Sequence, residues 1–142
     1  MKLSDRGIII RKTIEEDLSQ IYAVGKNYDA LINLPFAFNA ENLADIFASD
    51  SSGCYTAARK KKVLGFIAWS IKDNESILRW VMISKNFRRA GIGKALLTRC
   101  IEESEKYGVN SFLIEVLDNN DSTKFFTGSG FNLKETVLKF RL

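Results

Sequence analysis

Residues 88–94 of the chain read Arg88-Arg89-Ala90-Gly91-Ile92-Gly93-Lys94. They stand between a strand-like run, Ser76 to Ser84, and a strongly periodic helical segment, Ile92 to Tyr107. Two closely spaced glycines at the start of a helix leave backbone N–H groups uncovered, at the positive end of the helix dipole. The neighbouring arginines and lysine add positive charge that a phosphorylated ligand would use. The segment therefore predicts a binding site for the pyrophosphate of a cofactor.

The spacing of these glycines excludes two familiar nucleotide sites. A Walker-type loop has a glycine five residues before its Gly-Lys pair and a serine or threonine after that pair. Arg88 and Ala95 occupy these two positions, so the chain lacks a loop of that kind. A dinucleotide-binding fingerprint has a third glycine three residues after the second, where this chain has Leu96. The pattern that remains is Arg-x-x-Gly-x-Gly.

This remaining pattern resembles the acyl-CoA pyrophosphate loop of the GNAT superfamily of N-acetyltransferases. The resemblance implies that residues 88–94 hold the pyrophosphate of acetyl-CoA, which is then the acyl donor. A second stretch, Asn119 to Phe131, is similar to the C-terminal signature of the family, in which an asparagine precedes a short helix and a Gly-Phe pair. That asparagine contacts the cofactor in family members, which gives Asn119 the same role. Two alternatives remain open: a helix start without a ligand at Gly91 and Gly93, and a simple helix cap at Asn119.

Hydrophobic periodicity and turn residues predict the order of the elements. We expect strand Gly7–Arg11, a helix starting at Thr13, a helix capped by Asn39, strands Cys54–Arg59, Val63–Ile71 and Ser76–Ser84, helix Ile92–Tyr107, strand Ser111–Leu117, a short helix that starts at the turn Asp118–Asp121 and runs through Phe126, and strands Phe131–Glu135 and Val137–Leu142. The order βαα-βββ-α-β-α-ββ predicts an α+β fold with a mixed, mostly antiparallel sheet flanked by helices. This order is similar to that of the GNAT fold over almost the whole chain, so residues 1–142 are expected to form one domain of that kind.

The composition narrows the classes of function. With 142 residues, 46% of them hydrophobic, the chain can bury a real core, and no apolar run reaches the ~18 residues of a membrane span. The absence of histidine removes the commonest metal ligand and the commonest general base, which argues against zinc enzymes and Ser-His hydrolases. Cys54 and Cys100 are expected to be core residues in a reducing compartment. Because the N-terminus lacks a signal-peptide pattern, we expect a cytoplasmic protein with no membrane partner. Because the chain has no histidine, we also expect no metal.

The positive charge of the chain is modest and is concentrated in one run. The net charge of +4 does not by itself argue for nucleic acid, and no nucleic-acid partner is expected. Arg59-Lys60-Lys61-Lys62 is the densest basic run and lies between two predicted strands. We interpret it as a solvated hairpin turn, with a contact to a phosphate or an acidic partner as the alternative.

The acceptor amine must lose a proton, so the reaction calls for a carboxylate near the acetyl group. Glu115 is the first candidate, because it lies in the apolar run 112–116, where an unpaired buried carboxylate would be costly. This run resembles the fifth strand of the ribosomal-protein N-terminal acetyltransferases, whose glutamate at this place is the general base. A solvent-exposed or ion-paired Glu115 is the alternative. Glu75, in a predicted turn, is the weaker candidate.

Two further assignments follow from the resemblance. Val81, Met82 and Ile83 occupy the positions whose backbone, in family members, pairs with the pantetheine arm and polarises the thioester carbonyl. Phe126 stands where members often carry the tyrosine that protonates the departing thiolate. A phenylalanine has no proton to give, so its expected role is to pack against the pantetheine arm. Water or the acceptor would then supply the proton, or the thiolate would leave without it, since a thiol pKa lies near ~8.5.

These assignments imply an acetyl-CoA-dependent N-acetyltransferase whose acceptor is a primary amine on a small molecule, a peptide N-terminus or a lysine. Because neither cysteine is placed at the predicted site, direct attack in a ternary complex is the expected mechanism. The aromatic loop Tyr28–Phe38 would shape the acceptor pocket or belong to the core. The missing tyrosine keeps a second function open, that of an acetyl-CoA-binding sensor or partner module with little catalysis. The terminal strands also offer an edge through which a homodimer would form.

Overall fold

The structure, a computed structural model, describes residues 2–26, 36–115, 120–134 and 137–141. Its elements are β1 (Ile8–Lys12), α1 (Leu18–Gly25), α3 (Ala40–Ala48), β2 (Ser52–Arg59), β3 (Lys62–Lys72), β4 (Glu75–Ile83), α4 (Ile92–Glu105), β5 (Ser111–Glu115), α5 (Asn120–Gly128), β6 (Asn132–Lys134) and β7 (Val137–Arg141). Short 3-10 helices precede three of them: η1 (Leu3–Arg6), η2 (Glu15–Asp17) and η3 (Lys85–Phe87). This order confirms the predicted α+β fold.

The described strands form a mixed sheet in the order β1-β2-β3-β4-β5-β7-β6. Every neighbouring pair in it is antiparallel except β4 and β5, which run parallel. Parallel neighbours need a long crossover connection, and α4 supplies it between these two strands. β4 therefore lies at the centre of the sheet, with an antiparallel partner on one side and a parallel partner on the other.

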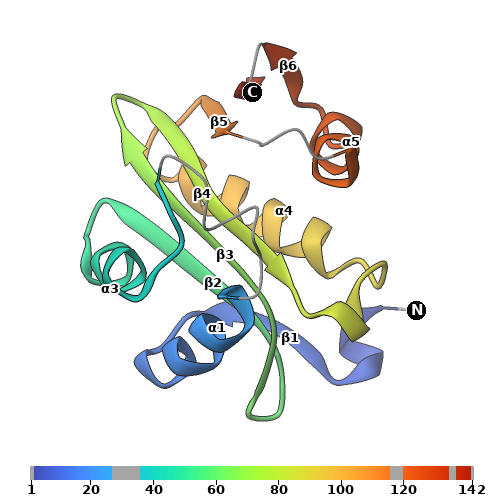
Figure 1. Ribbon diagram of the computed structural model, residues 1–142. Coiled ribbons are helices and arrows are strands. Elements are labelled where there is room, and N and C mark those ends of the chain that lie inside the picture. The colour runs from blue at the N-terminus through green and yellow to red at the C-terminus, as the bar shows by residue number, and fades with distance from the viewer. Residues whose placement is uncertain (1, 27–35, 116–119, 135–136, 142) are drawn as a thin grey trace.

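Helices cover both faces of this sheet. Figure 1 shows α1 and α3 on one side of the central strands and α4 on the other. The α4-side core consists of Ile8, Ala57, Leu64, Ile67, Trp69, Leu78, Ile92, Leu96, Leu97, Cys100, Val109, Phe112, Ile114, Phe126 and Phe131. The α1-side core consists of Ile21, Phe38, Leu43, Ile46, Cys54, Val63, Phe66, Ala68, Trp80 and Met82. Among the described residues, no helix combines the length and the apolar character that crossing a membrane requires.

Several predicted boundaries move by a few residues. Glu75, predicted to lie in a turn, is the first residue of β4, where its backbone is paired with Ser111 of β5. Helix α4 ends at Glu105, two residues before the predicted end, and β6 begins one residue after Phe131. Asn39 caps α3 as predicted, because its side chain accepts a hydrogen bond from the backbone N–H of Asn42.

The first helix begins later than its pattern of residues predicts. Helix α1 starts at Leu18 rather than at Thr13. Thr13 instead continues along the sheet, since its backbone N–H donates to the carbonyl of Cys54 at 3.0 Å. Its hydroxyl lies 2.7 Å from that of Thr56, and both side chains are buried. Thr13 therefore fixes the connection between β1 and α1 to the middle of β2.

Asp17 has a structural role in the same connection. Its carboxylate accepts hydrogen bonds from the two terminal nitrogens of Arg11, at 2.7 and 2.9 Å, and from the backbone N–H of Ile14 at 2.9 Å. Burial acts to raise the pKa of Asp17, but these bonds, with a smaller contribution from Thr56, outweigh it and lower the pKa below the usual aspartate value. The pair is thus stable only while Asp17 carries its charge.

We expect Asp17→Asn to destabilise the fold by about 2 kcal/mol at neutral pH, because Arg11 then loses its charged partner inside a mostly buried site. The pKa of Asp17 is lowered in the folded state, so its stabilisation is fully present above the unfolded value of about 3.9 and is lost as the pH falls through the folded value. The difference between wild type and variant should therefore shrink below about pH 4. Urea denaturation at several pH values measures it. The exposed Asp50→Asn is the control, and an equal loss in that variant would contradict the assignment.

Candidate functional site

The central feature of the site is the place where β4 and β5 stop pairing. The two strands are paired from Glu75 with Ser111 to Leu78 with Ile114, and no further. β4 continues to Ile83, held on its other side by β3 along its whole length. In the described part of the chain, no strand pairs with residues 79–83 on the side of β4 that faces away from β3. On that edge the backbone of residues 80–82 is therefore the part to which a ligand could pair, because the carbonyl of Ile83 already accepts from Arg88.

A β-bulge marks the same point. Ala68 and Trp69 of β3 pair with Trp80 and Leu78 of β4, so Arg79 is the extra residue. Such a bulge alters which face of the sheet the following side chains occupy. Leu78 accordingly belongs to the α4-side core, whereas Trp80 belongs to the α1-side core. The bulge therefore changes which side chains face α1 and which face α4 in the part of β4 that follows it.

Aromatic contacts gather around the bulge on the α1 side. The guanidinium carbon of Arg79 lies 4.6 Å from the centre of the Phe36 ring, and its Nε donates to the hydroxyl of Ser70 at 3.3 Å. The Trp80 ring stacks on Phe36 with centroids 5.5 Å apart, and its Nε1 donates to the Phe36 carbonyl at 3.3 Å. The sequence analysis overlooked Arg79, although a lone charge in the apolar run 77–83 was a signal for it.

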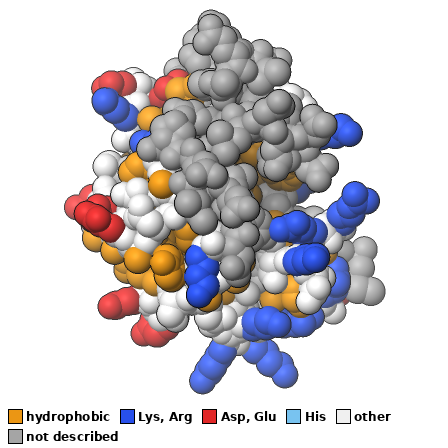
Figure 2. Space-filling view, in the orientation of Figure 1, with side chains coloured by type: hydrophobic (Ala, Val, Ile, Leu, Met, Phe, Trp, Pro, Cys, Tyr) orange, Lys and Arg blue, Asp and Glu red, His pale blue; other side chains and the backbone are white. Residues whose placement is uncertain are grey.

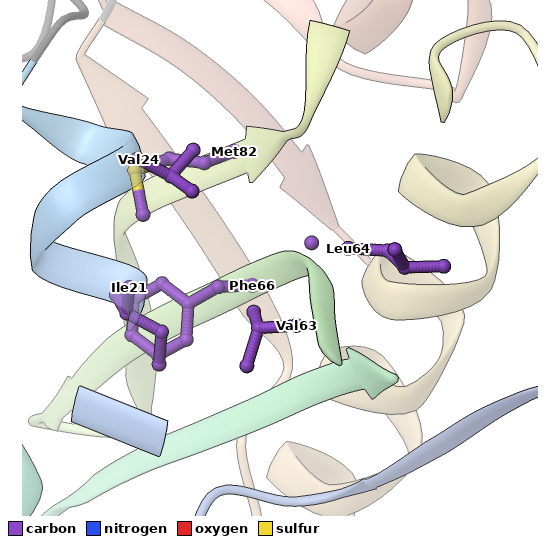
Figure 3. A pocket seen from close by; sticks show the side chains of 7 residues that line it. Ile21, Val24, Val63, Leu64, Phe66 and Met82 are labelled. Atoms are coloured by element: carbon purple, nitrogen blue, oxygen red, sulfur yellow. The ribbon is translucent and has the colours of Figure 1, made fainter. Parts of the chain in front are cut away.

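The side chains at the end of β4 are divided between the two cores. Met82 is buried in the α1-side core, while Val81 and Ile83 pack against the α4-side core. Figure 3 shows Met82 together with Val24 of α1 around a small apolar hollow, which has a volume of about 10 Å³. A hollow of this size holds no more than one water-sized group. The side chains of this stretch are thus used in packing, and its backbone edge is what remains for a ligand.

The glycine loop begins just beyond the end of β4. Gly91 has φ of +87°, a left-handed conformation that favours glycine, and it forms the N-cap of α4 without any side-chain cap. A β-carbon at Gly91 would meet nothing within 4 Å, so the space in front of the helix is open. Arg89 also has a left-handed conformation, with φ of +63°. The first backbone N–H groups of α4 have no partner within the helix and point into this open space.

Gly93 is needed for a different reason. A β-carbon there would lie 3.3 Å from the Cε1 and Cζ atoms of Phe125 on α5, which is tighter than ordinary contact. Phe125 therefore packs directly on the first turn of α4, beside Ile83. Phe125 was not among the predicted site residues, which included its neighbour Phe126 instead.

The charge around the loop suits an anion. Arg88, Arg89 and Lys94 are all exposed, and Arg88 Nε donates to the carbonyl of Ile83 at 3.3 Å. Ala90 and Ile92 turn inward to the α4-side core, so only their backbone faces the loop. An uncapped helix start, an open glycine and three exposed cations together fit the pyrophosphate of a nucleotide cofactor.

Comparison with known proteins identifies the family. A model of the acetyltransferase (GNAT) family matches residues 16–131, which is most of the chain. The chain belongs to this family. It is a GNAT-type N-acetyltransferase that uses acetyl-CoA. Among curated proteins, the ribosomal protein bS18-alanine N-acetyltransferase of Escherichia coli strain K12 is 28% identical over 111 residues, which cover 70% of this chain and 75% of that protein.

Solved structures agree on the fold. A PaiA N-acetyltransferase from Thermoplasma acidophilum, in complex with coenzyme A, superposes with a TM-score of 0.83 at 19% identity, covering 95% of this chain and 99% of the other. The ribosomal-protein-S18-alanine N-acetyltransferase from Escherichia coli superposes with a TM-score of 0.80 at 19% identity, covering 94% and 93%. The GNAT fold expected from the order of elements is thus confirmed.

The position of the GNAT tyrosine is occupied by a core residue. Phe126 is only 4% exposed and belongs to the α4-side core, where its ring makes edge contacts with Phe125 and Phe131. The half-buried neighbour Phe125 lies nearer to the glycine loop. The expected contact of Phe126 with the pantetheine arm remains a prediction. Asn119 lies outside the described residues, as does most of the aromatic loop Tyr28–Phe38.

The two candidate carboxylates stand at opposite ends of the paired part of β4 and β5. Glu115 is the last residue of β5, and its backbone comes level with Arg79, one step past the final β4–β5 pair. Glu75 begins β4, eight residues from Ile83, which places it about 26 Å from the glycine-loop end. Its carboxylate accepts a hydrogen bond from the Ser111 hydroxyl at 2.9 Å. The backbone thus favours Glu115, whose side chain is outside the described part of the structure.

Both cysteines are free and buried, one in each core. Burial raises the pKa of Cys54 to about 12, against a small opposing effect of Lys12. Burial also raises the pKa of Cys100, although a hydrogen bond with Ser104 opposes it. Neither thiol ionises at neutral pH, so neither is suited to carry an acyl group. In the described part of the chain, no group of residues could hold a metal ion.

We expect iodoacetamide to modify neither cysteine at pH 8 while the protein is folded, because only about one Cys54 in 10⁴ is then a thiolate. Unfolding in guanidinium chloride should expose both thiols and make them react at the rate of a free cysteine. Mass spectrometry counts the labels. Rapid labelling in the folded state, or an acetylated cysteine after incubation with acetyl-CoA, would contradict the burial described above.

Proposed function

We propose that this GNAT acetyltransferase transfers an acetyl group to a primary amine by direct attack, with donor and acceptor bound together. One observation carries the proposal: the uncapped glycine loop follows the end of β4, and the described part of β5 does not extend to that end of the strand. The first suits a pyrophosphate and the second suits an extended arm that pairs with a strand. The buried thiols of Cys54 and Cys100 argue against a covalent acyl-enzyme.

We assign the donor to residues around that gap. Arg88, Arg89 and the backbone of residues 90–94 would hold the pyrophosphate of acetyl-CoA, and Lys94 would add charge. The backbone edge of Val81–Ile83 would bind the pantetheine arm, and Asn119 would add a polar contact. Acetyl-CoA supplies an acetyl group activated as a thioester. The chain contributes orientation, which can account for a large part of the rate of a two-substrate reaction.

Glu115 is our candidate for the general base. The register supports it, because its backbone stands level with Arg79, where β4 loses its pairing with β5. A carboxylate at that level would receive the proton of the attacking amine, directly or through a water molecule. Arg79, on the bulge, brings a positive charge to the same level, and positive charge nearby favours the ionised form of a carboxylate.

The acceptor would approach from the α1 side of the sheet. The aromatic rings of Phe36 and Trp80 lie there beside the bulge, at the level of the proposed base. The relative from Escherichia coli is named for an alanine of a ribosomal protein. A peptide N-terminus is therefore the first acceptor class to screen, before lysines and small amines. An α-amine also loses its proton more easily than a lysine, with ordinary pKa values of about 8 and about 10.

The first test is calorimetric titration with acetyl-CoA, with free CoA and ATP for comparison. We expect micromolar binding to the wild type and its loss in Gly91→Trp, because the indole would fill the open space in front of α4. Gly108→Trp is the matched control: Gly108 has φ of +77°, its β-carbon position is also open, and it lies past the other end of α4. Loss of binding in both variants would point to unfolding, and retained binding in Gly91→Trp would overturn the loop assignment.

The second test addresses the base. We expect Glu115→Gln to lower kcat by about 10²–10⁴ with an unchanged affinity for acetyl-CoA, since general-base catalysis is worth about that much. Raising the pH should restore part of the activity, because more of the acceptor amine is then unprotonated. Glu75→Gln is the comparison, and it should retain activity. An unimpaired Glu115→Gln enzyme would reject the assignment, and binding without turnover in the wild type would favour a sensor function.

A further inference from the structure

The basic run 59–62 forms a tight turn between β2 and β3, as predicted. Lys60 has a left-handed conformation with φ of 56°. Lys60, Lys61 and Lys62 are exposed, and among the described residues none of these lysines is paired with an acidic side chain. Four successive cations repel one another, and this repulsion raises the free energy of the turn.

Contacts from two other elements hold this turn in place. On one side, Gln20 of α1 donates to the carbonyl of Lys61 at 2.9 Å and accepts from the backbone N–H of Val63 at 3.0 Å. On the other side, the Phe87 ring of η3 lies 4.9 Å from the guanidinium carbon of Arg59 and 5.7 Å from Lys62 Nζ. The turn is thus fixed to the scaffold, with an open hollow of about 560 Å³ beside it.

Phe87 also joins the turn to the glycine loop, which begins at the next residue. Neither residues 59–66 nor residues 84–94 contain an aspartate or glutamate. Figure 2 shows Lys and Arg side chains gathered on one side of this face and Asp and Glu side chains on the other. We call the two basic segments 59–62 and 85–94, which meet at Phe87, the basic face; they hold eight of the 21 cationic residues of the chain, Arg59, Lys60, Lys61, Lys62, Lys85, Arg88, Arg89 and Lys94.

We propose that the basic face binds the phosphate backbone of a nucleic acid, without reading its sequence. A phosphate backbone presents repeated charges along its length, which matches cations spread over a turn and a neighbouring loop. Because the backbone of the turn is already fixed by Gln20, binding would have to order only the lysine side chains. The proposal goes beyond acetyl transfer and does not depend on which amine is acetylated.

Two features favour a nucleic acid over an acidic protein segment. The basic face is a surface of exposed cations, while its aromatic ring, Phe87, is already covered by Arg59 and Lys62. It therefore offers little apolar area, and protein partners are anchored mainly by buried aromatic and aliphatic groups. Binding by charge alone, with no base contact, is the usual basis of sequence-independent recognition of nucleic acids.

The test is fluorescence anisotropy with a labelled RNA of about 20 nucleotides and a DNA duplex of about 20 base pairs, from about 50 to about 300 mM salt. We expect dissociation constants of about 1–100 µM at the lowest salt, and a steep linear fall of log K with log salt concentration. Lys60→Gln/Lys61→Gln should reduce the salt slope by about two and the affinity by about tenfold. Its binding of acetyl-CoA should stay as in the wild type.

The control is Lys72→Gln/Lys106→Gln, which removes the same charge from the end of β3 and from the C-cap of α4, where Lys106 also loses its ion pair with Glu103. Thermal unfolding checks that both variants fold. The proposal is overturned by any of three results: no binding of either nucleic acid at low salt, an equal loss of binding in the control variant, or tighter binding of poly-glutamate than of both nucleic acids. The last result would assign the face to an acidic protein.

Discussion

The limited pairing of β4 with β5 is the constraint on which the rest of this structure depends. Four residue pairs join the two strands, and a buried hydrogen bond of 2.8 Å between Ser76 and Ser104 fastens β4 to α4 at the same end. Beyond Leu78, the described residues pair with the strand only from the side of β3. One end of the gap is thus closed by pairing, and the other ends at the glycine loop. In the proposed site, the extended arm of the donor would lie in this gap, beside the part of β4 that the described residues of β5 do not reach.

The bulge at Arg79 makes this gap compatible with a packed core. Without it, Leu78 and Trp80 would occupy the same face, and an indole would have to fit against α4 instead of Phe36 and Phe38. With it, the side chains of β4 are divided between both cores while the backbone edge stays uncovered. The proposed recognition of the donor therefore relies on backbone groups and loop cations. This explains why apolar residues suffice along Val81–Ile83.

The sequence predicted those elements whose local pattern and tertiary role agree. The periodic helix α4, the three-strand meander and the glycine loop belong to this group. Helical structure starts at Glu15, two residues after the predicted start, and its first turn is the 3-10 helix η2, in which Asp17 pairs with Arg11. The bulge was not predicted, although the lone charge of Arg79 in the apolar run 77–83 marks its position. Phe125 was missed because only packing distinguishes it from Phe126.

The distribution of charge also depends on contacts that the sequence does not show. A net charge of +4 describes an unremarkable surface, yet the structure brings two distant basic segments together across one aromatic ring. Salt screens exposed charges over a length of about 8 Å at physiological ionic strength. Binding at the glycine loop and at the basic turn should therefore both weaken with salt. Binding at the glycine loop also depends on Gly91, because a ligand can reach the backbone N–H groups at the start of α4 only if no side chain is in the way. Binding to exposed charges at the basic turn has no such requirement.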